Sequence, residues 1–301
     1  MSKPVSWDEQ QAFLAVLEEG SLSGAARRLG ISHATARARL EALEAALRTV
    51  LFTRSPNGLT PTEQARELAA PARAMALASD HFVRLAAAPS GEAAGVVRIS
   101  VSEFMGVEVL PPMLAALRRS HPALQVELAL SNAPADLLAQ EVDVAVRAIR
   151  PAQEALVARK AATIPLGFFA ARAYLAERGA PAALNDLAGH DIIGPDRSRS
   201  DLAIAAGLGQ GFARERFALR TDSHPAQLAA ARAGLGIAVV QIPVGERDPI
   251  LRRVLPEVVV AELETWIVTH ESLRRLPRIR AVMDSLAEGF GRFAAADAGG
   301  F

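Results

Sequence analysis

The chain has 301 residues, equal numbers of basic and acidic side chains, and no cysteine. This length exceeds the usual size of a single hydrophobic core, so two or more domains are expected. The lack of cysteine excludes disulfides, thiol catalysis and cysteine-metal sites. Residues 1–10 carry acidic side chains where a secretory signal has an apolar core. No apolar run reaches the roughly 18 residues that span a bilayer, so we expect a cytoplasmic protein.

The zero net charge hides a basic segment near the N-terminus. Between Gly20 and Thr60 there are six arginines against only two acidic residues, both glutamates. Contact with phosphates requires a local basic face, whatever the balance of the whole chain. This segment is therefore a candidate for binding nucleic acid.

Three short helices are predicted at the start of the chain. Apolar residues at helical spacing lead to Gly20, a residue type that commonly ends helices. Ser23 is expected to cap a second helix, Gly24–Leu29, and Ser32 is expected to cap a third helix, His33–Leu47.

The second and third helices, joined by a tight turn at Gly30, predict a helix-turn-helix. Brief strands at Leu51–Arg54 and Leu59–Thr60 add a wing. The third helix is expected to enter the major groove with its N-terminal half at base edges, while hydroxyl groups contact phosphates. The candidate DNA contacts are Ser21, Ser23, Ser32, His33, Ala34, Thr35, Arg37, Arg39 and Arg54.

These candidates have alternative roles. Arg37 and Arg39 either hydrogen-bond guanine or contact only phosphate and water. Thr35 suits a base edge or a thymine methyl group, and His33 suits a base or a phosphate. The serines and Arg54 are expected to hold the DNA backbone.

A long alanine-rich helix is predicted from Pro61 to about Ala87. Small and apolar residues recur in it at steps of three and four, as along the seam of a helix pair, which favours dimerisation. The alternative is that this stripe packs on its own domain. Pro71 should bend the helix or remove a hydrogen bond, and residues 89–95 break the pattern and mark a hinge. The stripe consists of Ala65, Leu68, Ala72, Met75, Ser79, Phe82 and Ala86.

After the hinge, strand and helix patterns alternate. This order predicts parallel strands with crossover helices in two α/β lobes, the last strand returning towards the first lobe. Strands are expected at 96–101, 125–130, 142–147, 164–170, 191–193, 216–221, 237–241 and 262–269. Helices are expected at 110–120, 135–140, 171–178, 225–233 and 277–293.

One known family matches these motifs in order and spacing. The string EGSLSGAARRLGISHATARARLEALE (19–44), followed by Leu51-Phe52 and Arg54, resembles the DNA-binding domain of the LysR-type transcriptional regulators. The strings LTPTE (59–63), DVAVR (143–147), ARAGLGIA (231–238) and VTHESLR (268–274) resemble later landmarks of that family. The resemblance covers essentially the whole chain.

The chain departs from the family pattern at three places. Arg48–Val50 stands where Gly-Val-Arg is usual, Ala38 where arginine is common, and Gln64-Ala65 where Ala-Gly is usual. Arginines that relatives use on phosphates are thereby lost. The preferred DNA sequence therefore cannot be copied from relatives.

The resemblance implies a sensor like the periplasmic binding proteins, with a small-molecule effector between its lobes. Free N–H groups after Ser102 and Ser223 suit a carboxylate, whereas Glu103 and Asp222 would repel an anion, so a mono-anionic or neutral polar effector is expected. For Arg147, core packing or an internal ion pair is the alternative. The matching positions are Ser100, Ser102, Glu103, Ser131, Asn132, Arg147, Ile149, Thr221, Asp222, Ser223, His224, Gln241 and Ile242.

Signals for catalysis are weak. The histidines lie far apart without metal-ligand spacing, and no Gly-x-Ser-x-Gly string occurs. Residues Gly207–Gly211 are glycine-rich but do not match the dinucleotide fingerprint, and a surface loop is expected there. We therefore expect no enzymatic activity, no catalytic residues, no cofactor and no metal.

The whole sequence predicts an α+β multidomain protein. A winged helix-turn-helix occupies residues 1–60, a linker and dimerisation helix 61–89, and a two-lobed α/β effector-binding domain 90–301. Lobe 1 covers about 96–160 and 266–301, and lobe 2 about 161–265. The expected function is transcription regulation by a homodimer that assembles to a homotetramer on an imperfect inverted repeat in double-stranded DNA, contacting RNA polymerase if it activates.

Two other functions compete with this one. A two-lobed receptor without a DNA role leaves residues 1–60 unexplained. An enzyme fused to a helix-turn-helix lacks an assembled nucleophile, base or metal set.

Overall fold

The computed structural model describes residues 4–55, 58–86, 93–132, 142–151, 153 and 155–295. The chain forms two compact units, one essentially Met1–Ala86 and one comprising Ala87–Leu138 and Val142–Phe301. Among the described helices, none is long and apolar enough to cross a membrane. The helix predicted at 135–140 and most of the predicted hinge lie outside the described residues.

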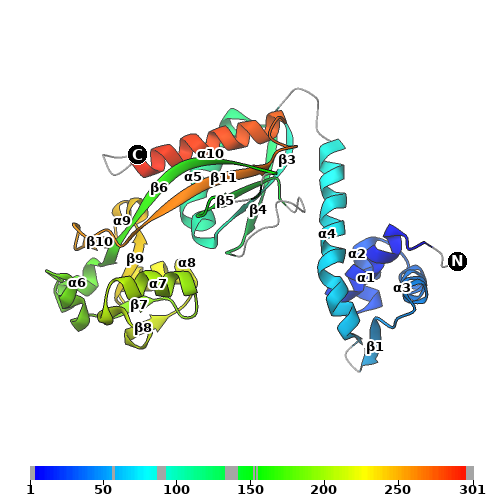
Figure 1. Cartoon of the computed structure of the whole chain (residues 1–301), viewed down its shortest axis with the longest axis horizontal. Coiled ribbons are helices and arrows are strands. Elements are labelled where there is room, and N and C mark those ends of the chain that lie inside the picture. The colour runs from blue at the N-terminus through cyan, green and yellow to red at the C-terminus, as the bar shows by residue number, and fades with distance from the viewer. Residues whose placement is uncertain are drawn as a thin grey trace. The chain divides into compact units, whose positions relative to one another are not determined.

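The first unit contains helices followed by a hairpin and a longer helix (Figure 1). Gly20 and Gly30 end the first two helices in the left-handed conformation, with φ of 67° and 65°, as the sequence predicts. The third helix has the predicted bounds. In chain order the elements are α1 (Trp7–Glu19), α2 (Leu22–Leu29), α3 (His33–Leu47), β1 (Phe52–Ser55), β2 (Gly58–Pro61) and α4 (Glu63–Ala86).

The cap predicted for α2 was wrong by two residues. The helix begins at Leu22, and the hydroxyl of Ser21, not that of Ser23, accepts the N–H of Gly24 at 3.1 Å. Ser23 lies in the first turn, where its side chain is exposed. Both positions hold serine, a residue type that commonly caps helices, so the residue type did not discriminate between them.

The hairpin of β1 and β2 is antiparallel and closes on the first helix. The N–H of Leu59 donates to the carbonyl of Gly20 at 2.9 Å. Gly58 has φ of +125°, and a Cβ there would lie 2.6 Å from that same carbonyl oxygen. Only glycine fits this close approach of two backbones. The wing is thus tied to the end of α1.

Helix α4 divides into a covered and an uncovered part. Ala65 and Ala72 are buried in the core of the first unit, with Phe13, Leu40 and others. Further along, Met75, Phe82 and Val83 are exposed, Phe82 by 73%. Ala65 and Ala72 of the predicted stripe therefore pack on their own unit, whereas Met75 and Phe82 are exposed. Pro71 lies inside α4 without ending it.

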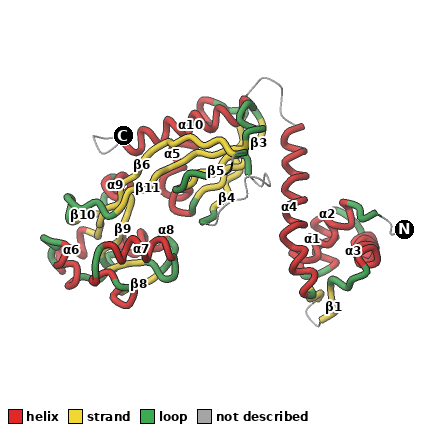
Figure 2. Tube along the Cα trace, viewed as in Figure 1, coloured by secondary structure: helices red, strands yellow, loops and turns green. Residues whose placement is uncertain are grey.

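The second unit is built on one continuous sheet (Figure 2). Within the described residues its strands follow the order β4-β3-β5-β11-β6-β9-β7-β8, with β10 paired to β6. The strands are β3 (Gly95–Val101), β4 (Leu124–Leu130), β5 (Val144–Arg147), β6 (Leu156–Ala171), β7 (Ile192–Gly194), β8 (Phe217–Arg220), β9 (Ile237–Gln241), β10 (Leu251–Val254) and β11 (Ala261–His270).

Two lobes share this sheet. Strands β3, β4 and β5 are parallel to one another, as are β7, β8 and β9, which confirms the predicted parallel pairing in each lobe. The prediction of parallel pairing was wrong for the strand at 164–170, because β6 is antiparallel to its neighbours β9 and β11. The long strands β6 and β11 lie between the two parallel sets and belong to both lobes (Figure 1). Only residues 164–170 of β6 were predicted, because its first half carries the exposed Arg159 and Lys160 and lacks an apolar run.

Helices lie on both parts of the sheet. A short π-helix, Met105–Val109, leads into α5, and α5 and α10 pack together over the first lobe. The predictions missed α7, α9 and β10, and the predicted loop at 207–211 begins inside the end of α7. The helices are α5 (Leu110–Ser120), α6 (Arg172–Arg178), α7 (Arg199–Gly207), α8 (His224–Arg232), α9 (Ile242–Glu246) and α10 (Pro277–Ala295).

Candidate functional site: a nucleic-acid interface and a sensor seam

Helix α3 presents one face to solvent and one to the core. Ala36, Leu40 and Leu43 are buried against the rest of the first unit. The opposite face is exposed and carries side chains that repeat at helical spacing. That face consists of His33, Ala34, Arg37, Ala38 and Glu41. An arginine-bearing helix face of this kind can lie along a duplex.

The start of α3 is fixed by its cap. The hydroxyl of Ser32 accepts the N–H of Thr35 at 3.0 Å, as predicted, and lies 2.8 Å from the Thr35 hydroxyl. Both hydroxyls are therefore engaged with each other while their residues stay exposed. Any contact of Thr35 with a base must share this hydroxyl with Ser32.

The arginines of the first unit differ in their surroundings. Arg39 is held by Asp8 of α1, with 2.5 Å between Nη2 and Oδ2. Glu18 binds Arg28 and, at 3.2 Å, Arg73 of α4. Burial opposes the ionisation of Glu18, but these hydrogen bonds outweigh it and lower its pKa. Glu18 thus ties α1 to α2 and α4.

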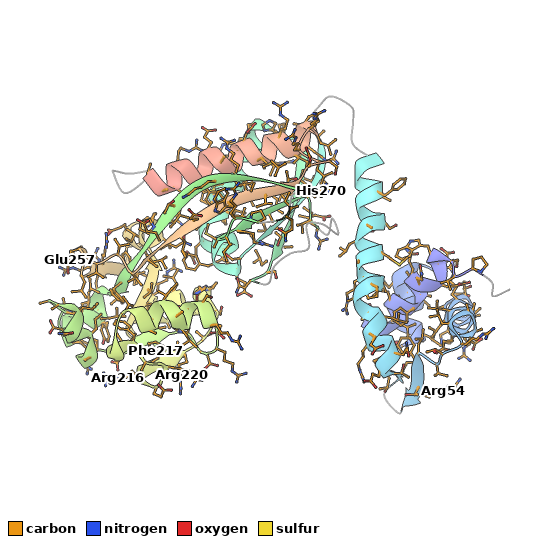
Figure 3. All side chains as sticks on the ribbon, viewed as in Figure 1. Arg54, Arg216, Phe217, Arg220, Glu257 and His270 are labelled. Atoms are coloured by element: carbon orange, nitrogen blue, oxygen red, sulfur yellow. The ribbon has the colours of Figure 1, made fainter. Side chains whose placement is uncertain are left out.

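Arg37 and Arg54 form no ion pair within the described residues, and both are exposed. Arg54 lies on β1 of the wing (Figure 3), opposite Leu59. Glu44 of α3 accepts the N–H groups of Leu51 and Phe52 at 2.6 and 3.2 Å. The wing and the exposed helix are therefore fixed to each other through one carboxylate.

In the second unit, the loops after β3 and β8 meet across the two lobes. The ring of Phe104 meets the ring of His224 edge-on, with 6.5 Å between centroids. Gln241, at the end of β9, donates to the sulfur of Met105 at 3.2 Å. The carboxyl ends of the parallel strands of both lobes thus face a common seam, where open α/β sheets bind ligands.

On the first-lobe side, Arg147 is the central polar group. Its guanidinium donates to the hydroxyl and carbonyl of Ser100 at 2.8 and 3.2 Å and to the carbonyl of Val146. No carboxylate pairs with it within the described residues, and burial lowers its pKa. Ser100 is buried, so its hydroxyl serves this contact.

The other first-lobe candidates differ in their hydrogen bonds and in their exposure to solvent. The side-chain oxygen of Asn132 accepts the N–H of Glu103 at 3.2 Å, which joins the loops after β3 and β4. The N–H of Ser131 donates to Val101, and Ser102 is half-buried beside Glu103. Ile149 is 80% exposed, so it does not line an enclosed site.

On the second-lobe side, the carboxylate of Asp222 is bound by backbone N–H groups of its own lobe. Its carboxylate accepts the N–H groups of Asp196, Arg197 and Ser198 at 2.9–3.1 Å. The N–H groups of Ser198 and Arg197 are the main cause of its lowered pKa. The expectation that Asp222 repels an anionic effector is therefore weakened, since three backbone dipoles already balance its charge.

His224 opens α8 and is paired within its own lobe. Its Nε2 lies 3.1 Å from Asp201 Oδ2, and this hydrogen bond raises the pKa of His224 above 6.5 against the effect of burial. Thr221 accepts the N–H of Ser223 at its hydroxyl and the amide of Gln227 at its carbonyl. The imidazole of His224, with its raised pKa, therefore stands beside Phe104 at the seam.

The last two candidates, Gln241 and Ile242, are both buried. Ile242 is fully buried in the core, so its side chain is not available to a ligand. Gln241 is buried as well, and its side-chain oxygen has no hydrogen-bond partner among the residues that the structure describes. Sequence reasoning missed Phe104, Met105 and Asp201 at the seam, because apolar residues and a helix-borne aspartate carry no local signal of it.

The described residues hold no group of three or more histidine or acidic side chains that could bind a metal. A helix-turn-helix with an exposed arginine face, followed by a two-lobed α/β unit, defines a DNA-binding regulator that responds to a small molecule. Two family models match the chain: the LysR-family bacterial regulatory helix-turn-helix over residues 7–66, and the LysR substrate binding domain over residues 90–291. The chain belongs to the LysR family of transcriptional regulators.

Curated relatives and solved structures agree with this family. The chain is 28% identical over 274 residues to an HTH-type transcriptional regulator of Haemophilus influenzae, covering 88% of this chain and 93% of that protein. It is 26% identical over 284 residues to the activator TtdR of Escherichia coli, covering 92% and 91%. Full-length CbnR in complex with target DNA has the same fold, with a TM-score of 0.70, 22% identity, and coverage of 95% and 99%.

Proposed function

We propose that α3 enters the major groove and that the wing and the start of α2 contact the DNA backbone. The exposed face of α3 carries this proposal, because its Arg37 has no ion-pair partner in the described part of the chain and a guanidinium can bind guanine through two hydrogen bonds. Arg54 and the exposed Ser23 suit phosphates. Ala34 and Ala38, being small, allow the helix to approach the base edges closely.

We further propose that the protein works in the cytoplasm as a homodimer that assembles to a homotetramer. The exposed Met75, Phe82 and Val83 on α4 support pairing of two such helices. Two-fold symmetry then relates two copies of α3, so the operator is an imperfect inverted repeat. The proposed division of the chain is 1–60 for DNA binding, 61–89 for dimerisation and 90–301 for sensing.

The effector is proposed to bind at the seam between the lobes. Arg147 lacks a carboxylate partner within the described residues, and the pKa of His224 is raised by its hydrogen bond to Asp201, so both support an anionic group. Glu103 remains acidic on the same side. A mono-anionic or neutral polar molecule fits this balance better than a dianion. Ser102, Ser131, Asn132, Thr221 and Ser223 would supply hydrogen bonds.

Regulation follows if the effector binds two arrangements of the lobes with different affinity. The protein is proposed to act without catalysis or a cofactor and to contact RNA polymerase where it activates.

The proposed DNA binding is tested by fluorescence anisotropy with duplexes that flank its own gene. Binding should weaken steeply with salt, as counterions are released from the duplex. Lack of salt-sensitive binding to these and to random duplexes would refute the proposal.

A further inference from the structure

One short segment of the first lobe makes several contacts with the second lobe. The ring of Phe104 contacts the ring of His224 at the seam. The sulfur of Met105 accepts a hydrogen bond from the amide of Gln241. Glu108 follows in the same segment, within the π-helix formed by residues 105–109. Helices of this type are rare and occur often at functional sites. The contact segment, residues 104–108, thus runs from the effector seam to Glu108.

Two arginines of the second lobe hold Glu108. Arg232 of α8 donates two hydrogen bonds of 2.9 Å to its carboxylate, and Arg247 donates to its backbone carbonyl. The guanidinium carbon of Arg247 also lies 5.6 Å from the centre of the Phe293 ring on α10. The side chain of Glu108 is only 16% exposed, so solvent and salt screen these contacts weakly. The second lobe brings two cations and one carboxylate, Asp248, to this cluster, and Glu108 supplies the second negative charge.

The contact between Glu108 and Arg232 is built to break and re-form. The Nε of Arg232 binds Asp248 at 2.7 Å, within the second lobe. Asp248 is buried and is itself held by the N–H of Ile250 at 2.9 Å. If the lobes part, Arg232 keeps this carboxylate as a partner, and Glu108 becomes hydrated. A partly buried charge left without a partner would make the separation costly. The second partner removes that cost.

The sheet is narrowest between the two lobes. Strand β11 pairs with β5 at Trp266–Thr269, and β6 pairs with β9 at Leu166–Phe169. Between these points, residues 162–165 of β6 and 262–265 of β11 pair only with each other within the described part of the chain (Figure 1). The register skips Ala161, which forms a bulge at the end of this two-stranded ribbon. Narrow ribbons twist more than wide sheets, and bulges bend strands. The ribbon is therefore the segment of the sheet that bends most easily.

We propose that the two lobes turn relative to each other about this ribbon, and that the contact of Glu108 with Arg232 and Arg247 is a latch that holds the arrangement described above. An effector at the seam lies beside the contact segment. It shifts the balance between the latched and unlatched arrangements by the difference in its affinity for them. This consequence for regulation rests on the proposed effector site, whereas the latch itself does not.

The latch is tested without an effector, by measuring distances within the full-length chain. The chain has no cysteine, so Ala115→Cys on α5 and Ala176→Cys on α6 place one spin label at an exposed site of each lobe. Double electron–electron resonance gives the distribution of distances between the labels. An excess of unlabelled protein restricts the measurement to distances within one chain.

Three substitutions are compared in this labelled background. Glu108→Gln removes the charge of the latch, and Glu108→Lys reverses it. Glu288→Gln is the matched control, because it makes the same chemical change in an exposed ion pair with Arg292, inside the single helix α10. Thermal unfolding of each variant shows whether it folds. If Glu108→Gln does not fold, Arg247→Gln takes its place, since it removes one latch contact and leaves the pair of Glu108 with Arg232.

Glu108→Gln should raise the population of a second label distance by about five- to thirtyfold relative to the parent, because it removes charge-assisted hydrogen bonds between the lobes. Glu108→Lys should raise it further, because it puts a third cation beside the two arginines. In a Trp7→Phe background, the fluorescence of Trp266 beside the bulge should change together with the distances. Glu288→Gln should leave both the distances and the fluorescence as in the parent.

Three results would overturn the inference. Unchanged distances in both Glu108 variants would show that the ion pair does not set the arrangement of the lobes. An equal shift in Glu288→Gln would show a general effect of charge. Changed distances with unchanged Trp266 fluorescence would refute the ribbon as the hinge. The proposed function fails separately, if the parent shows no salt-sensitive binding to duplexes, and that outcome leaves the distance measurement valid.

Discussion

Arg232 of α8 donates two hydrogen bonds of 2.9 Å each to the carboxylate of Glu108 in the short π-helix, and so joins the second lobe to the first. Its Nε also binds Asp248 at 2.7 Å. These interactions raise the pKa of Arg232 and keep it charged. Arg247 donates to the Glu108 carbonyl as well. Since α8 begins with His224 at the effector seam, one short helix connects that seam to the main ionic contact between lobes.

Removing the Glu108 carboxylate should destabilise the second unit. The side chains of Glu108 and Arg232 are 16% and 32% exposed, so we expect Glu108→Ala to lower the free energy of unfolding by roughly 2 kcal/mol, less than for a fully buried pair. Urea unfolding, followed by the fluorescence of Trp266 in a Trp7→Phe background, measures this loss of free energy. Asp284→Ala breaks the exposed pair with Arg159 and should cost under about 1 kcal/mol. Equal effects of the two variants would contradict the prediction.

Stability of the second unit should depend on pH through His224. Hydrogen bonding to Asp201, together with the charges of Asp222 and Glu103, raises its pKa in the folded protein above 6.5. The stabilisation that His224 contributes to the folded second unit is therefore complete below pH 6.5 and is lost as the pH rises through the folded-state pKa. The pKa of Asp201 is lowered from 3.8, so its stabilisation of the folded unit is present above pH 3.8 and is lost as the pH falls through its own folded-state pKa.

The corresponding measurement compares the parent with His224→Gln, which keeps a hydrogen-bond donor but does not titrate. The difference in unfolding free energy should be largest between pH 3.8 and 6.5 and shrink on either side. A difference independent of pH would show that the His224–Asp201 pair does not titrate with folding.

Gly58→Ala should destabilise the first unit, because the added Cβ meets the Gly20 carbonyl and φ is +125°. The expected loss is roughly 1–3 kcal/mol, with the hydrogen bond from Leu59 weakened. Thermal unfolding, followed by the fluorescence of Trp7, measures this loss of stability. Gly291→Ala, inside α10, is the matched control. A Cβ there meets no described atom within 4 Å, so this substitution should be neutral or stabilising.

Arg48→Gly should stabilise the first unit. Arg48 ends α3 with φ of 54°, a conformation that glycine adopts without strain. We expect a gain of about 0.5–1 kcal/mol in the free energy of unfolding. The same substitution at Arg27, inside α2, should instead cost about 1 kcal/mol. A loss of stability in Arg48→Gly would show that the arginine side chain makes a compensating contact.

Arg37 and Arg54 should affect DNA binding in different ways. Arg37→Ala is expected to reduce discrimination at one base pair by about 1–3 kcal/mol, because it removes a base contact from α3. Arg54→Ala is expected to weaken specific and random duplexes equally and to lower the salt slope by about 1. Anisotropy titrations at several salt concentrations separate the two. Arg119→Ala, on the exposed side of α5, should change neither.

Local sequence determined the elements of this protein well. The glycines at 20 and 30 set the ends of α1 and α2, and the cap at Ser32 set the start of α3. Apolar runs placed the parallel strands of each lobe within a few residues. These features depend on neighbours within a few positions, so a linear pattern contains them. The LysR resemblance also rested on such short strings.

Only the tertiary structure decided which polar side chains are free to act. Asp222 binds the backbone of residues 196–198, Arg39 binds Asp8, and Arg232 binds Glu108 from 124 positions away. No local pattern distinguishes these engaged groups from Arg37, which pairs with no carboxylate that the structure describes. Hydrogen bonds between distant residues exist only after the chain has folded, because the fold brings donor and acceptor within about 3 Å of each other.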